Sequence, residues 1–230
     1  MELVINFSGG KDSSAMLSYL CEKYPYITKH VVFADTGWEH NDAEEWSRSI
    51  VARFGLSLHV VRNPNKDFFS MVRRRGKFPS PTQRQCTSDL KRGPIQTWIR
   101  HNVADPVVIN CMGIRAEESP ARARKLKLSR DKTMTNSRRT VWNWLPIHGW
   151  TEQQVREYLS AREIPLHPVY QYLSRFSCQV CIYMTRRDLA AVKANNPAAF
   201  QRIADTETEI GFTMQPGRSI SEIVSEIHDR

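Results

Sequence analysis

The sequence predicts an α/β fold in which a parallel, twisted sheet carries helices on both faces. Short apolar runs rich in β-branched residues recur along the chain and alternate with segments of helical character. This alternation is typical of parallel sheets. Glycine and polar residues come directly after several of the runs. Because ligands bind open α/β sheets at the carboxyl ends of the strands, we expect a ligand site there.

The first predicted strand and the turn after it carry the most specific pattern in the chain. The strand, residues 3–7, is followed by Gly9 and Gly10, and a helix is predicted from Ser13. The glycines permit a tight turn in which backbone N–H groups can approach a ligand. A helix N-terminus at the same place favours anion binding, because its free N–H groups and its dipole point at one spot. Lys11 adds a mobile positive charge.

The remaining elements are predicted from the same signals in chain order. Further strands are expected at residues 30–34, 58–61, 107–111 and 141–145, and further helices at 42–54, 90–102, from 151, at 185–205 and from about 212. The stretch 62–87 is basic, contains several prolines and is predicted to be a long loop. We expect one α/β domain over residues 1–185 and a small helical extension over residues 186–230.

The composition bounds the class of protein. A chain of 230 residues is long enough for one sizeable α/β domain. We expect no membrane span, because no apolar stretch approaches about 18 residues. We also expect no signal peptide, because the chain starts directly with a strand. A cytoplasmic location follows as the expectation.

The formal net charge of +9 is unevenly distributed along the chain. Basic residues concentrate in the segments 73–77 and 115–139. Such segments suit a polyanionic partner, and we expect a nucleic-acid substrate or partner there. A solvated surface and a pocket for a small phosphorylated substrate are the alternatives.

The chain has five cysteines, an odd number for a disulfide framework. Cytosolic thiols stay reduced, so the Cys-x-x-Cys spacing of Cys178 and Cys181 favours metal or redox chemistry over a structural disulfide. His148, His167 and Tyr170 precede this pair and are weaker candidates for a site, since a lone histidine is more often structural.

The string Ser-Gly-Gly-Lys-Asp-Ser at residues 8–13 resembles the PP-loop of the ATP pyrophosphatases, which split ATP between its α and β phosphates. It fits neither a Walker A loop nor a dinucleotide-binding fingerprint. Over roughly residues 1–190, the chain resembles the PP-loop superfamily and, within it, the phosphoadenosine phosphosulfate (PAPS) reductase-like family. The resemblance implies the adenine nucleotide alpha hydrolase-like (HUP) fold.

Further segments extend the resemblance to a nucleotide site. Residues 33–37 resemble the family segment whose backbone meets adenine and whose acid lies near the ribose. Residues 113–119 resemble the G-x-R-x-x-E-S motif that closes the site, and residues 86–94 and 145–150 match two other family segments. The resemblance implies an adenine-nucleotide site made of Ser8, Gly9, Gly10, Lys11, Asp12, Ser13, Ala34, Asp35, Thr36, Gly113, Ile114 and Arg115.

The implied reaction is attack of a nucleophilic oxygen on the α-phosphate of ATP, with pyrophosphate leaving. Lys11 is expected to neutralise phosphate charge, and Asp12 or Asp35 to orient Mg²⁺ through water. Arg115 is expected to meet the α-phosphate or the substrate, with a structural salt bridge as the alternative. A helix-capping role is the alternative for Asp35. The predicted catalytic residues are Lys11, Asp12 and Arg115.

Iron–sulfur members of the family hold a cluster with a tandem cysteine pair and a later Cys-x-x-Cys. Here Cys86 alone stands at the tandem position. The predicted metal ligands are Cys86, Cys178 and Cys181, with Cys111 as either a fourth ligand or a buried bystander. Thiolates suit iron–sulfur clusters and zinc alike. We expect a 4Fe–4S cluster, with zinc or no metal as the alternatives.

The predicted function is cleavage of ATP at the α-phosphate, coupled to iron–sulfur-dependent sulfur transfer, with a nucleic acid as the candidate acceptor. A sulfonucleotide reductase of sulfur assimilation is the first alternative. Assimilatory reductases attack with a cysteine in a C-terminal tail, and no cysteine follows Cys181 here. A non-catalytic nucleotide-binding module and a nucleic-acid-binding subunit of a defence or phage system are further alternatives. The sequence does not identify the sulfur donor, and it does not decide whether the chain forms a homodimer.

Overall fold

The computed structural model describes residues 1–176 and 178–228. Ser177 and residues 229–230 at the end of the predicted extension lie outside the described residues. The chain forms two compact units, each assembled from several stretches of sequence. The first unit comprises Met1–Ala34, Asn41–Val61 and Pro94–His167, and the second comprises Asp35–His40, Arg62–Gly93 and Pro168–Arg230. The boundary expected at residue 185 stays a prediction.

The sheet has six strands in the order β3-β2-β1-β4-β6-β5. The strands are β1 (Glu2–Phe7), β2 (Lys29–Asp35), β3 (Leu58–Arg62), β4 (Val107–Met112), β5 (Leu128–Arg130) and β6 (Thr140–Trp144). β1 pairs in parallel with β2 and β4, and β4 pairs in parallel with β6. β5 joins β6 antiparallel at the edge. The sequence did not predict β5, because this short strand has no apolar run and Leu128 is exposed.

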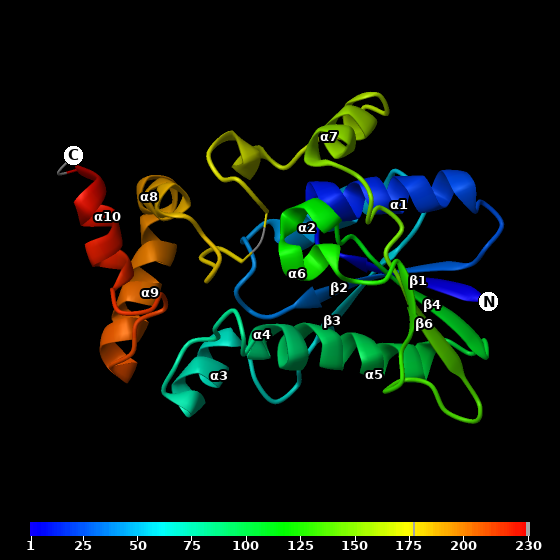
Figure 1. Ribbon diagram of the computed structural model, residues 1–230, viewed down its shortest axis with the longest axis horizontal. Coiled ribbons are helices and arrows are strands. Elements are labelled where there is room, and N and C mark those ends of the chain that lie inside the picture. Colours follow the sequence, from blue (N-terminus) through cyan, green and yellow to red (C-terminus); the bar gives the residue numbers. More distant parts are fainter. Residues whose placement is uncertain (177, 229–230) are drawn as a thin grey trace. The chain divides into compact units, whose positions relative to one another are not determined.

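Helices cover both faces of the sheet, as predicted (Figure 1). α1 (Lys11–Lys23) and α7 (Glu152–Ser160) pack together on one face, and α5 (Gly93–Asn102) lies on the other. Two more helices of this unit are α2 (Ala43–Ala52) and α6 (Pro120–Ala123). The predicted α/β fold with a mostly parallel sheet is therefore confirmed.

Apolar side chains attach α5 to its face of the sheet. Ile95 and Ile99 of α5 belong to one core cluster with Val4, Val32 and Val108 of the central strands. The three valines have no exposed surface. Burial of each such side chain stabilises the fold by about 1.5–3 kcal/mol. This packing fixes the strand ends from which the loops of the site begin.

Polar side chains replace the valines further along the same face. Asn6 Nδ2 donates to Asn110 Oδ1 at 2.6 Å, and Asn110 Nδ2 donates to Asn143 Oδ1 at 2.8 Å. Asn143 in turn donates to Asp131 at 3.1 Å. The three asparagines are half-buried, and these hydrogen bonds satisfy their amide groups where water has little access. They link β1, β4 and β6 just before the loops of the candidate site begin.

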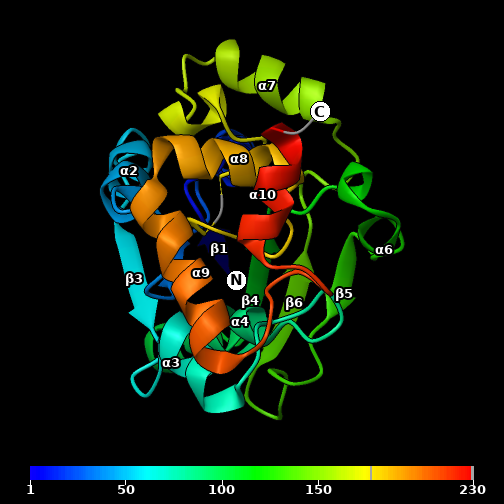
Figure 2. The ribbon, with the colours of Figure 1, turned by 90° about the vertical axis from the view of Figure 1, so that its left-hand side faces the viewer.

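The second unit is mainly helical. Its helices are α3 (Phe68–Arg75), α4 (Gln85–Thr87), α8 (Arg186–Asn195), α9 (Pro197–Ile210) and α10 (Ile220–His228). Figure 2 shows α8, α9 and α10 gathered side by side, and α8 contacts both of the others. Trp38 is 1% exposed, lies against Phe68 and Phe69, and donates from Nε1 to the Val180 carbonyl at 3.0 Å.

The prediction of a loop over residues 62–87 was wrong in part, because α3 lies within it. Asp67 Oδ1 accepts from Ser70 N at 2.7 Å, and Ser70 Oγ accepts from Asp67 N at 3.0 Å. This reciprocal capping box starts the helix. Gly76, with φ of 61°, ends it in the left-handed conformation that glycine adopts readily. The sequence of this short helix resembles that of a solvated loop, because it ends in the basic residues 73–75.

The segment 185–205, which the sequence predicts to be helical, forms two helices, α8 and α9. Asn196 separates them, and its side chain accepts from Ala199 N at 3.2 Å. Pro197 has no N–H to continue α8, and it suits the first turn of a new helix. Among the residues that the structure describes, no helix has both the length and the apolar character that a bilayer crossing requires.

Candidate nucleotide site

The loop between β1 and α1 forms the centre of the site. Gly9 has φ of 75°, a conformation that other residues rarely adopt. Ser13 holds the loop, because its hydroxyl donates to the Gly10 carbonyl at 2.9 Å and accepts from Ser8 N at 3.3 Å. α1 begins at Lys11, two residues earlier than predicted, with Gly10 as its N-cap. Since glycine offers no capping side chain, the first N–H groups of α1 suit an anionic ligand.

Trp46 of α2 supports this loop from the side. Its indole Nε1 donates to the Gly9 carbonyl at 3.0 Å. The ring of buried His167 lies edge-on to Trp46, with 5.0 Å between the ring centroids. His167 Nε2 is also 3.0 Å from Asp42 Oδ2. His167 therefore lies behind the indole that contacts the loop.

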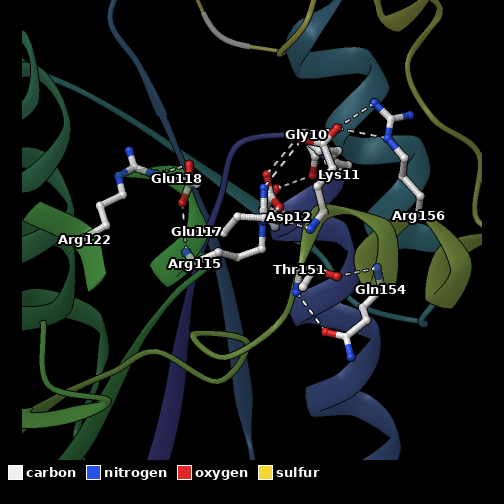
Figure 3. Close-up of polar contacts among 12 residues, drawn as sticks. Gly10, Lys11, Asp12, Arg115, Glu117, Glu118, Arg122, Thr151, Gln154 and Arg156 are labelled. Carbon is white, nitrogen blue, oxygen red and sulfur yellow. Dashed lines mark hydrogen bonds and ion pairs between the residues drawn. The ribbon is translucent and has the colours of Figure 1, made fainter. Parts of the chain in front are cut away.

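Two buried cations lie at the loop. Lys11 is 5% exposed and Arg115 is 3% exposed. Figure 3 shows both side chains with Asp12, and Arg115 Nε donates to Asp12 Oδ1 at 2.6 Å. Burial acts to lower the pKa of Arg115, but the neighbouring Asp12 and Glu117 outweigh it and leave this pKa raised. Arg115 therefore stays charged in the folded protein.

Three carboxylates surround these cations. Asp12 Oδ2 lies 3.5 Å from Lys11 Nζ. Glu152, the first residue of α7, places Oε1 at 3.8 Å from Lys11 Nζ and Oε2 at 3.8 Å from Arg115 Nη2. Glu117 pairs with Arg115 and accepts from the backbone N–H of Glu152 at 2.6 Å. The loop thus holds its cations in a network of ion pairs.

The segment after β4 positions Arg115 against the loop. A Cβ added to Gly113 would lie 3.1 Å from the Asp12 carbonyl oxygen, so only glycine fits here without a shift. Ile114 follows, and Arg115 N donates to Glu118 Oε2 at 2.8 Å. Glu118 is itself paired with Arg122. The structure therefore brings the 8–13 loop and the 113–115 segment together, as the resemblance implies.

The predicted adenine and ribose residues divide between the two units. Ala34 is buried in β2 of the first unit. Asp35 and Thr36 belong to the second unit, where Asp35 pairs with Arg62 at 2.6 Å and accepts from Gly37 N at 2.7 Å. A cavity of about 440 Å³ lies beside them, with lining residues Asp35, Thr36, Gly37, Arg62, Asn63, Pro64, Asn65, Lys66, Asp67 and Ser70.

Three of the predicted metal ligands gather in the second unit. Burial raises the pKa of Cys86, and the neighbouring Cys181 adds to the rise. Burial also raises the pKa of Cys178, although nearby Lys91 opposes it. Lys91 Nζ lies 3.1 Å from Glu39 Oε1. Cys178 also pairs with Glu39 in an isolated β-bridge, so the cysteines lie in one region beside the Lys91–Glu39 pair. Burial favours the protonated thiol at Cys86 and Cys178.

The donor types fit iron or zinc, but the arrangement is not a ready ligand set. Within residues 1–176 and 178–228, no three His, Cys, Asp or Glu side chains are positioned to hold one metal ion. Cys111 belongs to the first unit, has no exposed surface, and donates weakly from Sγ to the Ile109 carbonyl at 3.7 Å. Burial raises its pKa. These observations favour the buried bystander over the fourth ligand.

Sequence reasoning did not single out Glu117, Glu152 and Trp46. Glu117 lies inside the quoted 113–119 motif, so its position was a usable signal. Glu152 follows a helix-start signal at Thr151, and only the tertiary packing of α7 brings it to Lys11. His148 was a weak candidate. It is 6% exposed and contacts the Arg122 carbonyl at 3.0 Å through Nε2, a structural contact.

Comparison with known families identifies the class of protein. The model of the phosphoadenosine phosphosulfate reductase domain matches residues 2–205. The chain therefore belongs to this domain family within the PP-loop superfamily, which confirms the resemblance carried by its motifs.

Related proteins cover this chain to different extents. An uncharacterized 37.8 kDa protein of Escherichia phage 186 is 27% identical, over 94% of this chain and 77% of that protein. An uncharacterized protein of Methanocaldococcus jannaschii is 25% identical over 90% of this chain and 48% of its own length. Sulfate adenylyltransferase subunit 2 of Agrobacterium fabrum is 25% identical over 75% of this chain and 58% of the subunit. The chain thus spans only about half the length of some relatives.

Solved structures share the fold at low sequence identity. The PAPS reductase of Candida auris, in a phosphate complex, aligns with a TM-score of 0.52 and 16% identity, over 74% of this chain and 77% of that one. The FMN adenylyltransferase of Candida glabrata, with FAD and pyrophosphate, aligns with a TM-score of 0.53 and 17% identity, over 77% and 55%. These likenesses support the α/β fold.

Proposed function

We propose that the chain binds ATP, or another adenylyl nucleotide, and cleaves it at the α-phosphate with release of pyrophosphate. The observation that carries this proposal is the glycine loop with two buried cations, Lys11 and Arg115, beside it. The N–H groups at the start of α1 would bind the departing phosphates. The cations would stabilise the charge that develops on them.

In the proposed reaction, an oxygen of the acceptor attacks the α-phosphorus. The bond from that phosphorus to the bridging oxygen breaks, and its electron pair leaves with pyrophosphate. Lys11 would bind the leaving phosphates, and Arg115, oriented by Asp12, would bind an α-phosphate oxygen. Mg²⁺ bound with the nucleotide would supply further charge neutralisation. Asp12 would orient its water ligands.

The direct test is pyrophosphate release from ATP by Lys11→Ala and Ser13→Ala variants. We expect each rate to fall by about 10²-fold or more, because preorganised charge and donors at the phosphates are lost. Lys23→Ala is the matched control, since Lys23 is exposed in the last turn of the same helix. Unchanged turnover in both loop variants would contradict the proposal. ATP binding without pyrophosphate release would favour the non-catalytic module.

A sulfonucleotide reductase is the second candidate, favoured by the family match. It predicts sulfite release from adenylyl sulfate, or from its 3′-phosphorylated form, with a thiol as reductant. Sulfite formation that survives Lys11→Ala but not Cys178→Ala would favour the reductase over pyrophosphate release.

We further propose that Cys86, Cys178 and Cys181 support sulfur transfer to the acceptor, with a 4Fe–4S cluster as the candidate cofactor. Three thiols from two segments gather beside Lys91 and Glu39, and thiolates are the usual ligands of such clusters. Anaerobic purification with iron and sulfide analysis tests this. We expect a brown protein whose iron is lost on Cys178→Ala. A colourless protein that still releases pyrophosphate would limit the function to adenylation.

A nucleic acid is the proposed acceptor. In the first unit, the basic segment 115–139 borders a cavity of about 240 Å³ lined by Met112, Ile114, Lys125, Leu126, Ser129, Asn143 and Leu145. Met112 and Ile114 flank Gly113, so this cavity adjoins the segment that carries Arg115. Pyrophosphate release stimulated by RNA or DNA, and reduced by Lys125→Ala, would support this acceptor. Stimulation by small sulfur acceptors alone would contradict it.

A further inference from the structure

We propose that Glu152 is a positioning residue that competes with phosphate for the two cations of the loop. The Glu152 carboxylate lies 3.8 Å from Lys11 Nζ and 3.8 Å from Arg115 Nη2. Its two oxygens thus face the two cations that the proposed function assigns to ATP. This inference rests on that function. It adds that the Glu152 side chain sets the affinity of the site for polyphosphate.

The contacts of Glu152 suit a group that can be displaced. Its side chain is 43% exposed, whereas Lys11 and Arg115 are almost fully buried. Asp12 contacts Arg115 at 2.6 Å, a full hydrogen bond, but Glu152 approaches both cations only at ion-pair distance. A phosphate oxygen at hydrogen-bond distance would therefore replace the longer Glu152 contacts before it replaces Asp12.

Arg156 gives the displaced carboxylate a second partner. It lies one turn further along α7, and its Nε and Nη2 approach Glu152 Oε1 at 3.0 and 2.9 Å. Figure 3 shows Arg156 on the far side of Lys11 from Arg115. Arg156 holds part of the Glu152 charge away from the loop. When polyphosphate enters, Glu152 can remain paired with Arg156 while Lys11 and Arg115 change partners.

The charge balance of the network supports this competition. Lys11 and Arg115 face Asp12, Glu117 and Glu152, so the carboxylates outnumber the cations unless Arg156 is included. An entering anion must displace carboxylates from these cations, so the network lowers the affinity of the loop for anions. Neutralising Glu152 should release that charge, and removing Arg156 should leave Glu152 to bind the cations more strongly.

Calorimetric titration with inorganic pyrophosphate tests the proposal. We expect Glu152→Gln to tighten binding about five- to tenfold, since half-exposed ion pairs are worth modest factors each. Arg156→Gln should weaken binding about two- to fivefold. In the double variant, the Arg156→Gln effect should disappear, because Arg156 acts through Glu152. Glu157→Gln, on the exposed side of the same helix, is the control for a general change of charge.

Each outcome decides the proposal. The proposal is supported if pyrophosphate affinity rises in Glu152→Gln, falls in Arg156→Gln, and in the double variant equals that of Glu152→Gln alone. Unchanged or weaker binding by Glu152→Gln overturns it, as does an Arg156→Gln effect that persists in the double variant. A wild-type chain that binds neither pyrophosphate nor ATP would overturn the proposed function as well. Thermal melting of every variant checks that each one folds.

Discussion

Arg115 Nε donates to Asp12 Oδ1 at 2.6 Å, and this bond joins residues 103 positions apart in the sequence. It ties the segment that leaves β4 to the first turn of α1. This bond therefore fixes both residues relative to the glycine loop. An arginine suits this role because its planar guanidinium can hold Asp12 and Glu117 at once.

Arg115→Lys should therefore fail to preserve activity although it preserves charge. A lysine ammonium cannot reproduce the planar contacts to both carboxylates, so we expect about 10²-fold slower pyrophosphate release. The measurement is the release rate at saturating ATP. Arg48→Lys, in an exposed pair with Glu44 of the same unit, is the control and should be neutral. Near wild-type turnover of Arg115→Lys would reduce Arg115 to a structural ion pair.

Gly113→Ala should disturb the loop through its backbone. The new Cβ would lie 3.1 Å from the Asp12 carbonyl oxygen and 3.2 Å from Ser13 N, so the start of α1 must shift. We expect a loss of about 1–3 kcal/mol in unfolding free energy, typical of an overpacked contact, together with weaker ATP binding. Gly149→Ala is the control, since its Cβ would meet only Lys127 Nζ at 3.8 Å. Equal behaviour of the two variants would contradict a tight approach at Gly113.

The sheet was predictable because its central strands are buried runs of apolar residues. Leu3, Val4 and Ile5 predict a buried strand, and the glycine loop after them marks its end. α3 and β5 were not predictable in the same way. α3 depends on the reciprocal cap between Asp67 and Ser70. β5 has an exposed apolar residue, and its position comes from pairing with β6.

The residues of the candidate site also fall into two groups, those that local sequence pattern predicts and those that only tertiary packing brings to the loop. The residues of the loop and of the 113–119 motif are contiguous in sequence, so local pattern was enough to find them. Glu152 reaches the loop only because α7 packs beside α1, and Trp46 reaches it from α2 through a tertiary hydrogen bond. No local signal marks such a side chain, because a glutamate in the first turn of a helix is common.

Trp46→Phe should weaken the loop while it keeps an aromatic ring at this position. Phenylalanine keeps an aromatic face toward His167 but removes the N–H that donates to the Gly9 carbonyl at 3.0 Å. We expect a loss of about 0.5–1.5 kcal/mol in stability, the usual net value of one hydrogen bond. Nucleotide affinity should fall by about a few-fold, which corresponds to a similar loss of binding free energy. Calorimetry with ATP measures this. Trp98→Phe on α5 is the control, and an equal loss of affinity there would contradict a specific role for Trp46.

Asp188 gives the second unit a stability that depends on pH. Its carboxylate accepts from Ser174 N at 2.9 Å and from Thr185 Oγ1 at 2.8 Å. Burial acts to raise the pKa of Asp188, but these hydrogen bonds outweigh it, and the folded-state pKa is lowered. A lowered pKa means that the stabilisation is fully present above the unfolded-state value of about 3.9 and is lost as pH falls through the folded-state value.

Asp188→Asn should therefore cost most at neutral pH and least in acid. We expect a loss of about 1–3 kcal/mol at pH 7, because the amide cannot accept the same set of hydrogen bonds. Urea unfolding from pH 7 down toward pH 3 measures it, and the gap between wild type and variant should narrow in acid. Asp205→Asn is the control, since Asp205 contacts only Gln201 one turn away among the hydrogen bonds of the described residues. A gap that stays constant with pH would contradict a role for the ionised carboxylate.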